Sequence, residues 1–409
     1  MDLRELIYVL SGVLDFVGVT DVHHGKRVAH MAVATGRALG VTGERQATLF
    51  EAALLHDIGV STTREHDRLI AEPGYPDMRR HCRRGEAILS RFGPLAHLAP
   101  IVAQHHTPWF QLRTINDTVT DDMRQAASVI HLVDRVDAQL AGHGAADPLA
   151  LRRHVLDRLA QTDARLFAPD VVAAFRTAAA SDALWFGLDP DALPVALAPL
   201  ARGGQYHTLS AAELIDVATL FAGIVDAKSP FTAEHSAGVA RLSVCLGQWV
   251  GLDPEQITLL EVAALLHDIG KLRVPDHILD KPGPLTRAER AVMNRHAYYT
   301  HHILAQITGF ESVALWAACH HEALDGSGYP FRKDATTLPL EARIIAVADV
   351  FQALAQTRPY RPALGLPQIM EILEQMAARR ILDGDLVALV AANRVECWHR
   401  AVEAAAVAA

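Results

Sequence analysis

Hydrophobic residues recur along most of the chain at spacings of three and four positions, which is the period of an amphipathic α-helix. The segments ERQATLFEAALLHDIG (44–59) and PEQITLLEVAALLHDIG (254–270) both follow this pattern and end on a glycine, as a helix C-terminus does. The segment 340–354, LEARIIAVADVFQAL, is apolar on nearly all sides, which predicts a central helix. Alternation with a period of two is scarce. The pattern therefore predicts an all-α protein.

The seven letters ALLHDIG occur twice, at 53–59 and 211 positions later at 264–270. The same shift aligns His24 with His235, and a shift of 215 aligns the residues that follow, including Asp134 with Asp349. The chain is therefore interpreted as two diverged copies of one module of about 200 residues.

We predict two domains, residues 1–190 and 206–409, because 409 residues exceed what one hydrophobic core usually organises. Their junction is expected within 187–208, where proline and glycine break the helical period. Two similar modules are also expected to pack together as an internal pseudo-dimer.

Composition excludes several classes of protein. No apolar run has membrane-spanning length and the N-terminus lacks the features of a signal peptide, so we expect no membrane association and a cytoplasmic location. A formal net charge of −9 argues against a nucleic-acid-binding protein. The four cysteines form no C-x-x-C pair, which predicts buried thiols without disulfides.

Five histidines and two aspartates recur in register in both copies, although most of the letters around them differ. The second copy contains His235, His267, Asp268, His296, His320, His321 and Asp349, and the first contains His24, His56, Asp57, His81, His105, His106 and Asp134. Imidazole and carboxylate donors suit iron, manganese, nickel or zinc. Seven donors exceed the needs of one ion, and two adjacent ions can share a hydroxide that attacks phosphorus, which predicts phosphate-ester hydrolysis. The alternative is a set of buried polar residues that only hold helices together.

The second copy resembles a known family. Its stretches HDIGKLRVPDHILDKPGPLT, HHEALDGSGYP and TRPYRP are similar to those of the HD-GYP subfamily of the HD superfamily of metal-dependent phosphohydrolases, whose members hydrolyse cyclic di-GMP. This resemblance covers about residues 206–400. The first copy resembles the broader HD superfamily only, as a divergent HD domain.

The resemblance implies a role for each matched position. It implies that the seven second-copy residues ligate two divalent ions, iron or manganese, with nickel, magnesium or zinc as alternatives. It also implies catalytic roles for Asp268, as the bridging ligand, and for Lys271. The implied substrate-binding residues are Lys271, Gly328, Tyr329, Pro330, Arg358 and Arg361. Some members bind a third metal through a glutamate four positions before the first histidine; Phe231 stands there in this chain, so we expect two metals.

The first copy keeps every candidate ligand but not the substrate-binding residues. Val60 stands at the position of Lys271, RTI (113–115) at that of GYP, and His143 and Ala146 at those of the two arginines. An empty cluster of histidines and carboxylates has little structural value. Selective retention therefore predicts that the first copy still binds metal and either acts on another phosphoester or regulates its neighbour.

The leading functional hypothesis is a phosphodiesterase that converts cyclic di-GMP to pGpG or further to GMP. Two alternatives stay open at this point. One is the same chemistry on another cyclic dinucleotide such as 3′,3′-cGAMP, because metals and arginines recognise phosphates and not bases. The other is a metal-loaded signalling scaffold with weak catalysis. A homodimer and a GGDEF-type protein partner are further expectations.

Overall fold

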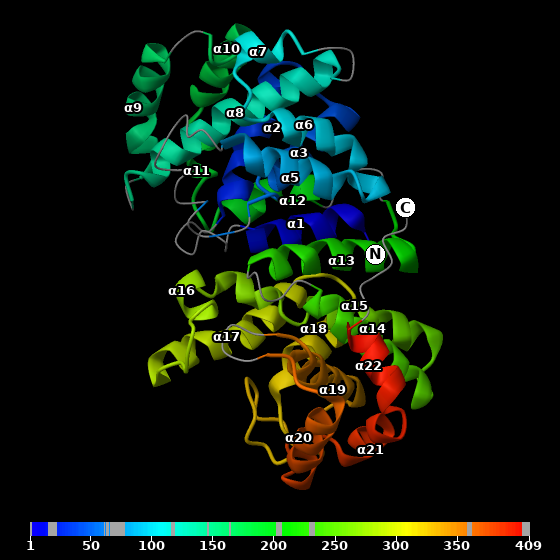
Figure 1. Ribbon diagram of the computed structural model, residues 1–409. Coiled ribbons are helices and arrows are strands. Elements are labelled where there is room, and N and C mark those ends of the chain that lie inside the picture. Colours follow the sequence, from blue (N-terminus) through cyan, green and yellow to red (C-terminus); the bar gives the residue numbers. More distant parts are fainter. Residues whose placement is uncertain are drawn as a thin grey trace. The chain divides into compact units, whose positions relative to one another are not determined.

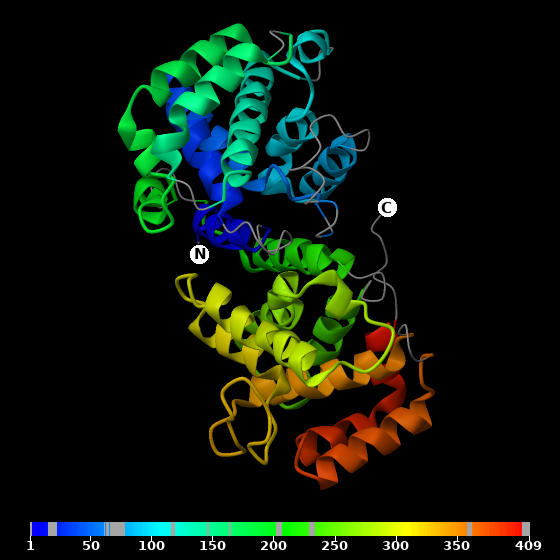
Figure 2. The same cartoon turned by 90° about the vertical axis from the view of Figure 1, so that its left-hand side faces the viewer.

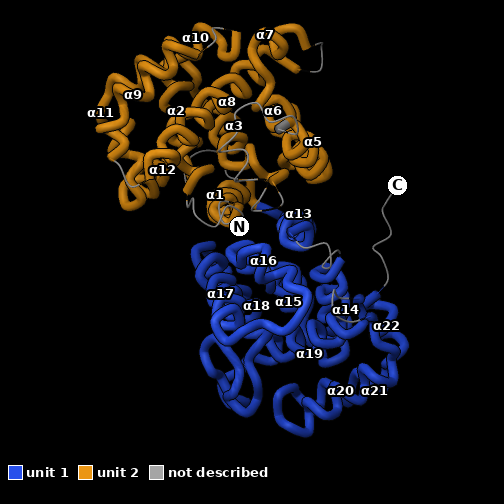
Figure 3. The backbone as a smooth tube through the Cα atoms, turned by 60° about the vertical axis from the view of Figure 1, so that its left-hand side comes forward, with its two compact units in different colours: residues 1, 209–409 blue, residues 2–208 orange. Residues whose placement is uncertain are grey.

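The computed structural model describes residues 2–14, 23–60, 62, 65, 78–115, 119–144, 147–162, 165–201, 207–228, 234–357 and 362–402. The chain divides into two compact units, residues 2–208 and residues 209–409 together with Met1 (Figure 3). Within the described ranges both units consist of helices, turns and loops, and the β-pairing there is an isolated bridge between Asp2 and Thr208. The predicted all-α fold is confirmed.

The first unit is built around α2, which packs against α3, α8 and α10 (Figure 1). Apolar residues at helical spacing, such as Val28, Met31 and Ala32, are fully buried on this helix. The unit contains α1 (Leu3–Leu14), α2 (His24–Ala38), α3 (Gly43–Leu55), α5 (Met78–Leu89), η2 (Gly93–Leu98), α6 (Ala99–Gln104), α7 (Trp109–Leu112), α8 (Asp121–Ala141), α9 (Pro148–Gln161), α10 (Pro169–Ala179), α11 (Asp182–Phe186) and α12 (Leu193–Ala201).

The second unit is built around α14 and α19, which pack against each other (Figure 2). It contains α13 (Ala211–Lys228), α14 (His235–Trp249), α15 (Pro254–Leu266), η3 (Ile269–Arg273), α16 (Asp276–Leu279), α17 (Arg287–Leu304), α18 (Glu311–Ala318), η4 (Cys319–His321), α19 (Leu340–Ala355), α20 (Leu366–Ala378), α21 (Gly384–Ala392) and α22 (Arg394–Val402). Helix α19 also contacts α18, α20 and α22, so the prediction of a central helix at 340–354 is confirmed.

The repeated ALLHDIG segment begins as a helix but ends earlier than predicted. Helix α3 ends at Leu55 and α15 at Leu266, so that His56 and His267 take the C-cap positions. The two glycines are not helix-terminating residues with positive φ. A Cβ atom on Gly59 would lie 2.0 Å from the carbonyl oxygen of His81, and one on Gly270 would lie 2.1 Å from that of His296. The glycine is required because the turn lies directly against the helix that carries the third histidine.

The predicted junction, 187–208, is partly helical. Helix α12 lies within it and packs on α1 and α2 with Leu193 and Leu197 buried. Proline and glycine content indicated a break in this segment, but packing against the first unit stabilises a helix around them. The boundaries 1–190 and 206–409 and the internal pseudo-dimer stay predictions.

Two predictions from composition can be compared with the described structure. All four cysteines are buried and none forms a disulfide, which confirms the prediction. Among the described helices, none combines the length and the apolar character needed to cross a membrane.

Candidate metal and catalytic sites

Asp268 lies at the centre of the cluster in the second unit, directly after the end of α15. Its Oδ2 atom is 3.6 Å from His235 Nε2 and 3.3 Å from His267 Nε2. Its Oδ1 atom is 3.5 Å from His296 Nε2 and 3.8 Å from His320 Nε2. One carboxylate therefore stands between two pairs of imidazole nitrogens, with one oxygen for each pair. This is the arrangement that a carboxylate bridging two ions requires.

The two other predicted ligands of this unit join the same cluster. Asp349, on α19, places Oδ1 3.3 Å from His235 Nε2 and 3.9 Å from His267 Nε2. The ring of His321 lies 4.0 Å from that of His320 and 5.1 Å from that of His296. The structure thus brings all seven sequence-predicted donors of the second copy together.

Hydrogen bonds fix the direction of the imidazoles. Nδ1 of His267 lies 2.7 Å from the carbonyl oxygen of Ala264, and Nδ1 of His320 lies 2.6 Å from that of Ala317. Nδ1 of His235 lies 2.5 Å from Oε1 of Gln352. Because these oxygens only accept, each Nδ1 must donate, which directs each Nε2 to the centre of the cluster, where it can bind a cation once it carries no proton.

The electrostatics of the cluster suit cation binding. Burial lowers the pKa of His296 to about 3 and that of His321 to about 4, so both rings are neutral ligands at pH 7. Burial alone would raise the pKa of Asp268, but His267 and Lys271 lower it well below its usual range. Asp268 Oδ1 and His267 Nε2 are buried without hydrogen-bond partners, which a divalent cation would provide. The donor set therefore fits the predicted metals.

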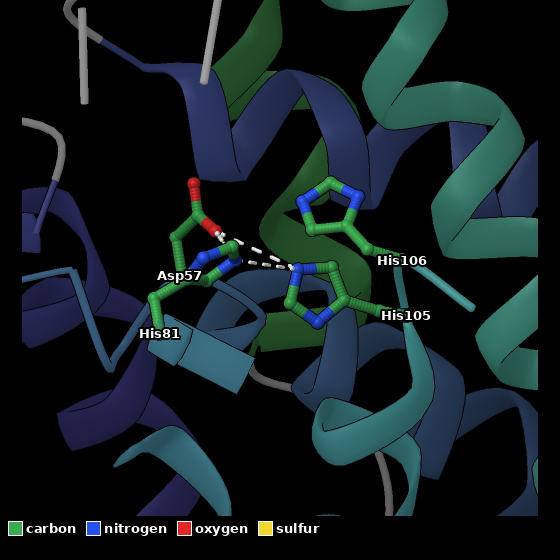
Figure 4. Close-up of side chains that lie close together, drawn as sticks. All are labelled: Asp57, His81, His105 and His106. Carbon is green, nitrogen blue, oxygen red and sulfur yellow. Dashed lines mark hydrogen bonds and ion pairs between the residues drawn. The ribbon is translucent and has the colours of Figure 1, made fainter. Parts of the chain in front are cut away.

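The first unit repeats this geometry around Asp57. Its Oδ2 atom is 3.7 Å from His24 Nε2 and 3.6 Å from His56 Nε2, and its Oδ1 atom is 3.3 Å from His81 Nε2 and 3.6 Å from His105 Nε2. Figure 4 shows Asp57 and His81 facing the ring of His105.

The remaining first-copy donors complete the cluster of the first unit. Asp134 Oδ1 lies 3.5 Å from His24 Nε2, and Asp134 Oδ2 lies 3.8 Å from His106 Nδ1. His106 also lies beside His105, with 4.2 Å between ring centroids. All seven predicted donors of the first copy therefore also lie together.

The groups behind the ligands differ between the units. His24 Nδ1 lies 2.7 Å from Oδ2 of Asp137, and Arg27 makes two hydrogen bonds to the same carboxylate at 2.7 and 2.8 Å. Asp137 aligns with Gln352. The Nδ1 atom of the first histidine therefore faces a carboxylate in the first unit and an amide oxygen in the second. Arg135 also pairs with Asp134 at 2.9 Å, at a position occupied by Val350 in the second unit.

Both units place a non-glycine residue with positive φ directly before the first histidine: His23 has φ 78° and Glu234 has φ 67°. This conformation is uncommon outside glycine and concentrates at functional sites. It lets α2 and α14 begin on the ligand itself, so that His24 and His235 lie at helix N-termini. Glu234 is exposed, and Phe231 lies outside the described residues.

Lys271 and the GYP segment border the second cluster. The Lys271 ammonium pairs with Asp268. The buried Lys228 donates a hydrogen bond to the carbonyl oxygen of Leu272 at 2.5 Å, next to Lys271 in the chain. The backbone N–H of Tyr329 donates to the His321 carbonyl at 3.2 Å, and the ring centroids of these two residues are 4.9 Å apart.

The HHE glutamate holds the GYP loop in place. Glu322 accepts hydrogen bonds from the backbone N–H groups of Phe331 (2.6 Å) and Lys333 (3.1 Å). A Cβ atom on Gly328 would lie 2.4 Å from the Glu322 Cα atom, so only glycine permits this approach. Pro330 follows Tyr329 in the same loop. Arg358 and Arg361 lie outside the described residues.

The first unit lacks these features at the aligned positions. Val60, at the position of Lys271, is buried and apolar, while Arg113, Thr114 and His143 are exposed. Ala146 lies outside the described residues.

Sequence reasoning missed three residues beside the clusters: Cys82, Asp137 and Gln352. Asp137 and Gln352 each lie three positions after a ligand aspartate and are buried on the same face of its helix. A polar residue at this aligned position was the available signal. Cys82 has no counterpart thiol, because Ala297 stands at its position in the second copy.

Two helical units, each with a histidine–aspartate cluster arranged around one central carboxylate, have the arrangement expected of tandem metal-dependent phosphohydrolases. Comparisons with known proteins agree with this class. Family models described as "HD domain" match residues 22–139 and 219–386. The 3′3′-cGAMP-specific phosphodiesterase 1 of Vibrio cholerae is 34% identical over 408 residues, which cover 98% of this chain and 94% of that protein. The chain belongs to the HD-domain family of phosphodiesterases.

Two further proteins are similar to this chain, one in sequence over part of its length and one in fold. The cyclic di-GMP phosphodiesterase response regulator RpfG of Xanthomonas campestris pv. campestris is 46% identical over 133 residues, which cover 31% of this chain and 35% of that protein. The crystal structure of a cyclic GMP-AMP specific phosphodiesterase of V. cholerae, V-cGAP3, matches with a TM-score of 0.67 at 24% identity, covering 97% of this chain and 98% of that one. At this level of identity, the similarity to V-cGAP3 is evidence for a shared fold.

Proposed function

We propose that the second unit hydrolyses a phosphodiester bond of a cyclic dinucleotide and that 3′3′-cGAMP is its preferred substrate. The observation that carries the reaction is the Asp268 carboxylate, which lies between two histidine pairs with Lys271 beside it. The choice of substrate is supported by the V. cholerae relative whose similarity extends over both units and whose name specifies 3′3′-cGAMP.

The seven donors of the second unit would hold two divalent cations, iron or manganese, with nickel, magnesium or zinc as alternatives. Such ions activate water and clamp phosphate oxygens. Asp268 would keep the two positions a fixed distance apart. Lys271, whose side chain is 21% exposed, can turn from Asp268 to a phosphate oxygen or to the leaving oxygen.

The GYP loop supplies one wall of the site. Tyr329 covers His321, and the loop is held by Glu322, so the substrate meets a preformed surface. Arg358 and Arg361 would pair with the phosphates as planar forks.

Cyclic di-GMP is a second candidate substrate. It is favoured by the 46% identity to RpfG, which is confined to about a third of this chain. The products of the hydrolysis assay described below show whether the reaction stops at the linear dinucleotide or continues to mononucleotides. The predicted homodimer and GGDEF-type partner stay predictions.

For the first unit we propose metal binding without hydrolysis of a cyclic dinucleotide. Its seven donors keep the geometry of the second unit, but Val60 and the residues RTI at 113–115 offer no equivalent of Lys271 and the GYP loop at the aligned positions.

The test compares initial rates of hydrolysis of 3′3′-cGAMP and cyclic di-GMP by the full chain loaded with iron or manganese. We expect cleavage of both or of 3′3′-cGAMP alone, with a higher kcat/KM for 3′3′-cGAMP. Lys271→Ala should lower kcat by about a hundredfold or more, because a cation is lost where charge develops. Arg176→Ala, which removes an exposed cation from α10 of the first unit, serves as the control and should leave these rates unchanged. A metal-loaded chain that cleaves neither substrate would overturn the proposal.

A further inference from the structure

Cys82 lies inside the cluster of the first unit. It directly follows His81 on α5 and is fully buried. Its Sγ atom is 3.6 Å from His81 Nε2 and 4.0 Å from His105 Nε2. The aligned residue of the second unit, Ala297, is equally buried but has no donor atom. The two clusters therefore differ in one soft donor.

These distances fit ligands of a single ion. His81 Nε2 and His105 Nε2 are 3.2 Å apart, and Asp57 Oδ1 lies 3.3 and 3.6 Å from them. With metal–nitrogen and metal–sulfur bonds of about 2.1 and 2.3 Å, the sulfur–nitrogen distances of 3.6 and 4.0 Å subtend about 110° and about 130° at the metal, which a distorted tetrahedral site accommodates.

Other atoms of the same cluster indicate that a ligand belongs there. His106 is 5% exposed, and its Nδ1 atom has no hydrogen-bond partner. Asp57 Oδ1 is also buried without a hydrogen-bond partner. Asp57, His81, His105 and His106 offer donor atoms within 4.8 Å of one another (Figure 4). A cation at this position would satisfy these atoms.

We propose that Cys82 is an additional metal ligand in the first unit, which makes this site selective for borderline divalent ions such as zinc, iron or cobalt over manganese and magnesium. The inference rests on the proposed metal binding by the first unit. The thiol releases its proton to solvent as the metal–sulfur bond forms, and no oxidation state changes. Thiolate sulfur favours the softer ions, whereas a site of imidazole and carboxylate alone also accepts manganese. The two units of one chain would then hold different metals.

Cobalt provides a direct test, because a thiolate bound to Co²⁺ gives a charge-transfer band in the near ultraviolet. The full chain is stripped with a chelator and titrated with Co²⁺ under anaerobic conditions. We expect the band in the wild type and its loss in Cys82→Ala and Cys82→Ser. In competition, Cys82→Ala should also lose about tenfold or more of the preference for zinc over manganese.

Cys319→Ala is the matched control. This cysteine is also buried and adjacent to a ligand histidine, but it packs in an apolar cluster with Leu338 and Ala342. It should keep the band. Thermal unfolding of each metal-free variant shows whether the fold is intact, and the serine variant preserves the size of the side chain if alanine does not fold.

The outcomes separate the two proposals. A band that persists without Cys82, or cobalt bound to the first unit of the wild type without a band, overturns the ligand assignment alone. Cobalt content that is unchanged by Asp57→Ala overturns metal binding by the first unit and the Cys82 assignment with it.

Discussion

Single residues that hydrogen-bond to the first histidine distinguish the two histidine–aspartate clusters. His24 is backed by the carboxylate of Asp137, which Arg27 in turn holds, whereas His235 is backed by the neutral amide of Gln352. A carboxylate partner makes an imidazole a stronger donor and fixes its direction. His24 is therefore expected to bind metal more firmly than its counterpart in the second unit.

Asp137→Asn tests this difference. The substitution keeps the shape of the side chain but removes its charge, so the metal affinity of the first unit should fall by about 10- to 100-fold. The measurement is a chelator competition in a chain that also carries Asp268→Ala, which removes the bridging ligand of the second unit. Asp170→Asn, an exposed carboxylate on α10, is the control. An affinity equal to that of the control would contradict the role of Asp137.

The sequence predicted the ligands because they recur in register, and it missed the residues that do not. Fourteen positions repeat as seven pairs, and all of them converge on Asp57 or Asp268. Asp137 and Cys82 have different counterparts, Gln352 and Ala297, so no repeated letter marked them; the sequence indicated Asp137 only through the polar residue that both copies place there. Their roles depend on which side chains meet in the folded chain.

Among the elements, the turn that follows α3 and α15 sets the geometry of each cluster. Gly59 and Gly270 let this turn lie against the backbone of α5 and α17, which carry His81 and His296. The sequence predicted both helices but assigned the glycines to helix termination. The close approach of these glycines to another helix is a tertiary contact, so the local spacing of hydrophobic residues in the sequence does not indicate it. The same holds for α12, which packing stabilises within a segment rich in helix-breaking residues.

Gly270→Ala should therefore damage the second unit. The new Cβ atom would meet the His296 carbonyl oxygen at 2.1 Å, so the backbone must shift, at a cost of about 1–3 kcal/mol or more in the free energy of unfolding. The shift also separates Asp268 from His296 and should lower metal content. Chemical denaturation and metal analysis measure both effects.

Gly223→Ala is the control for this substitution. Gly223 lies within α13 with no atom within 4 Å of an added Cβ, so alanine should stabilise the chain by about 0.5–1 kcal/mol. If Gly270→Ala is as stable as the wild type and retains its metal, the packing argument for the ALLHDIG glycine is wrong.

At the scale of the whole molecule, both copies retain one histidine–aspartate cluster per unit and differ in the residues around it. Within the described residues, the second unit has a lysine beside Asp268 and a GYP loop against His321, and the aligned positions of the first unit carry neither feature. Recognition of the family and of both helical units was possible from the sequence, because the motifs are specific and the period is clear. The substrate was not, since phosphate-binding groups do not distinguish one purine from another.

The most direct test of this account is metal content together with hydrolysis of 3′3′-cGAMP and cyclic di-GMP, for the wild type, Asp57→Ala and Asp268→Ala. The account predicts that Asp268→Ala lowers hydrolysis by at least about a hundredfold. It also predicts that Asp57→Ala lowers metal content while leaving the bulk of the hydrolysis in place. Loss of hydrolysis in Asp57→Ala as complete as in Asp268→Ala, or full hydrolysis in Asp268→Ala, would contradict the assignment of the reaction to the second unit.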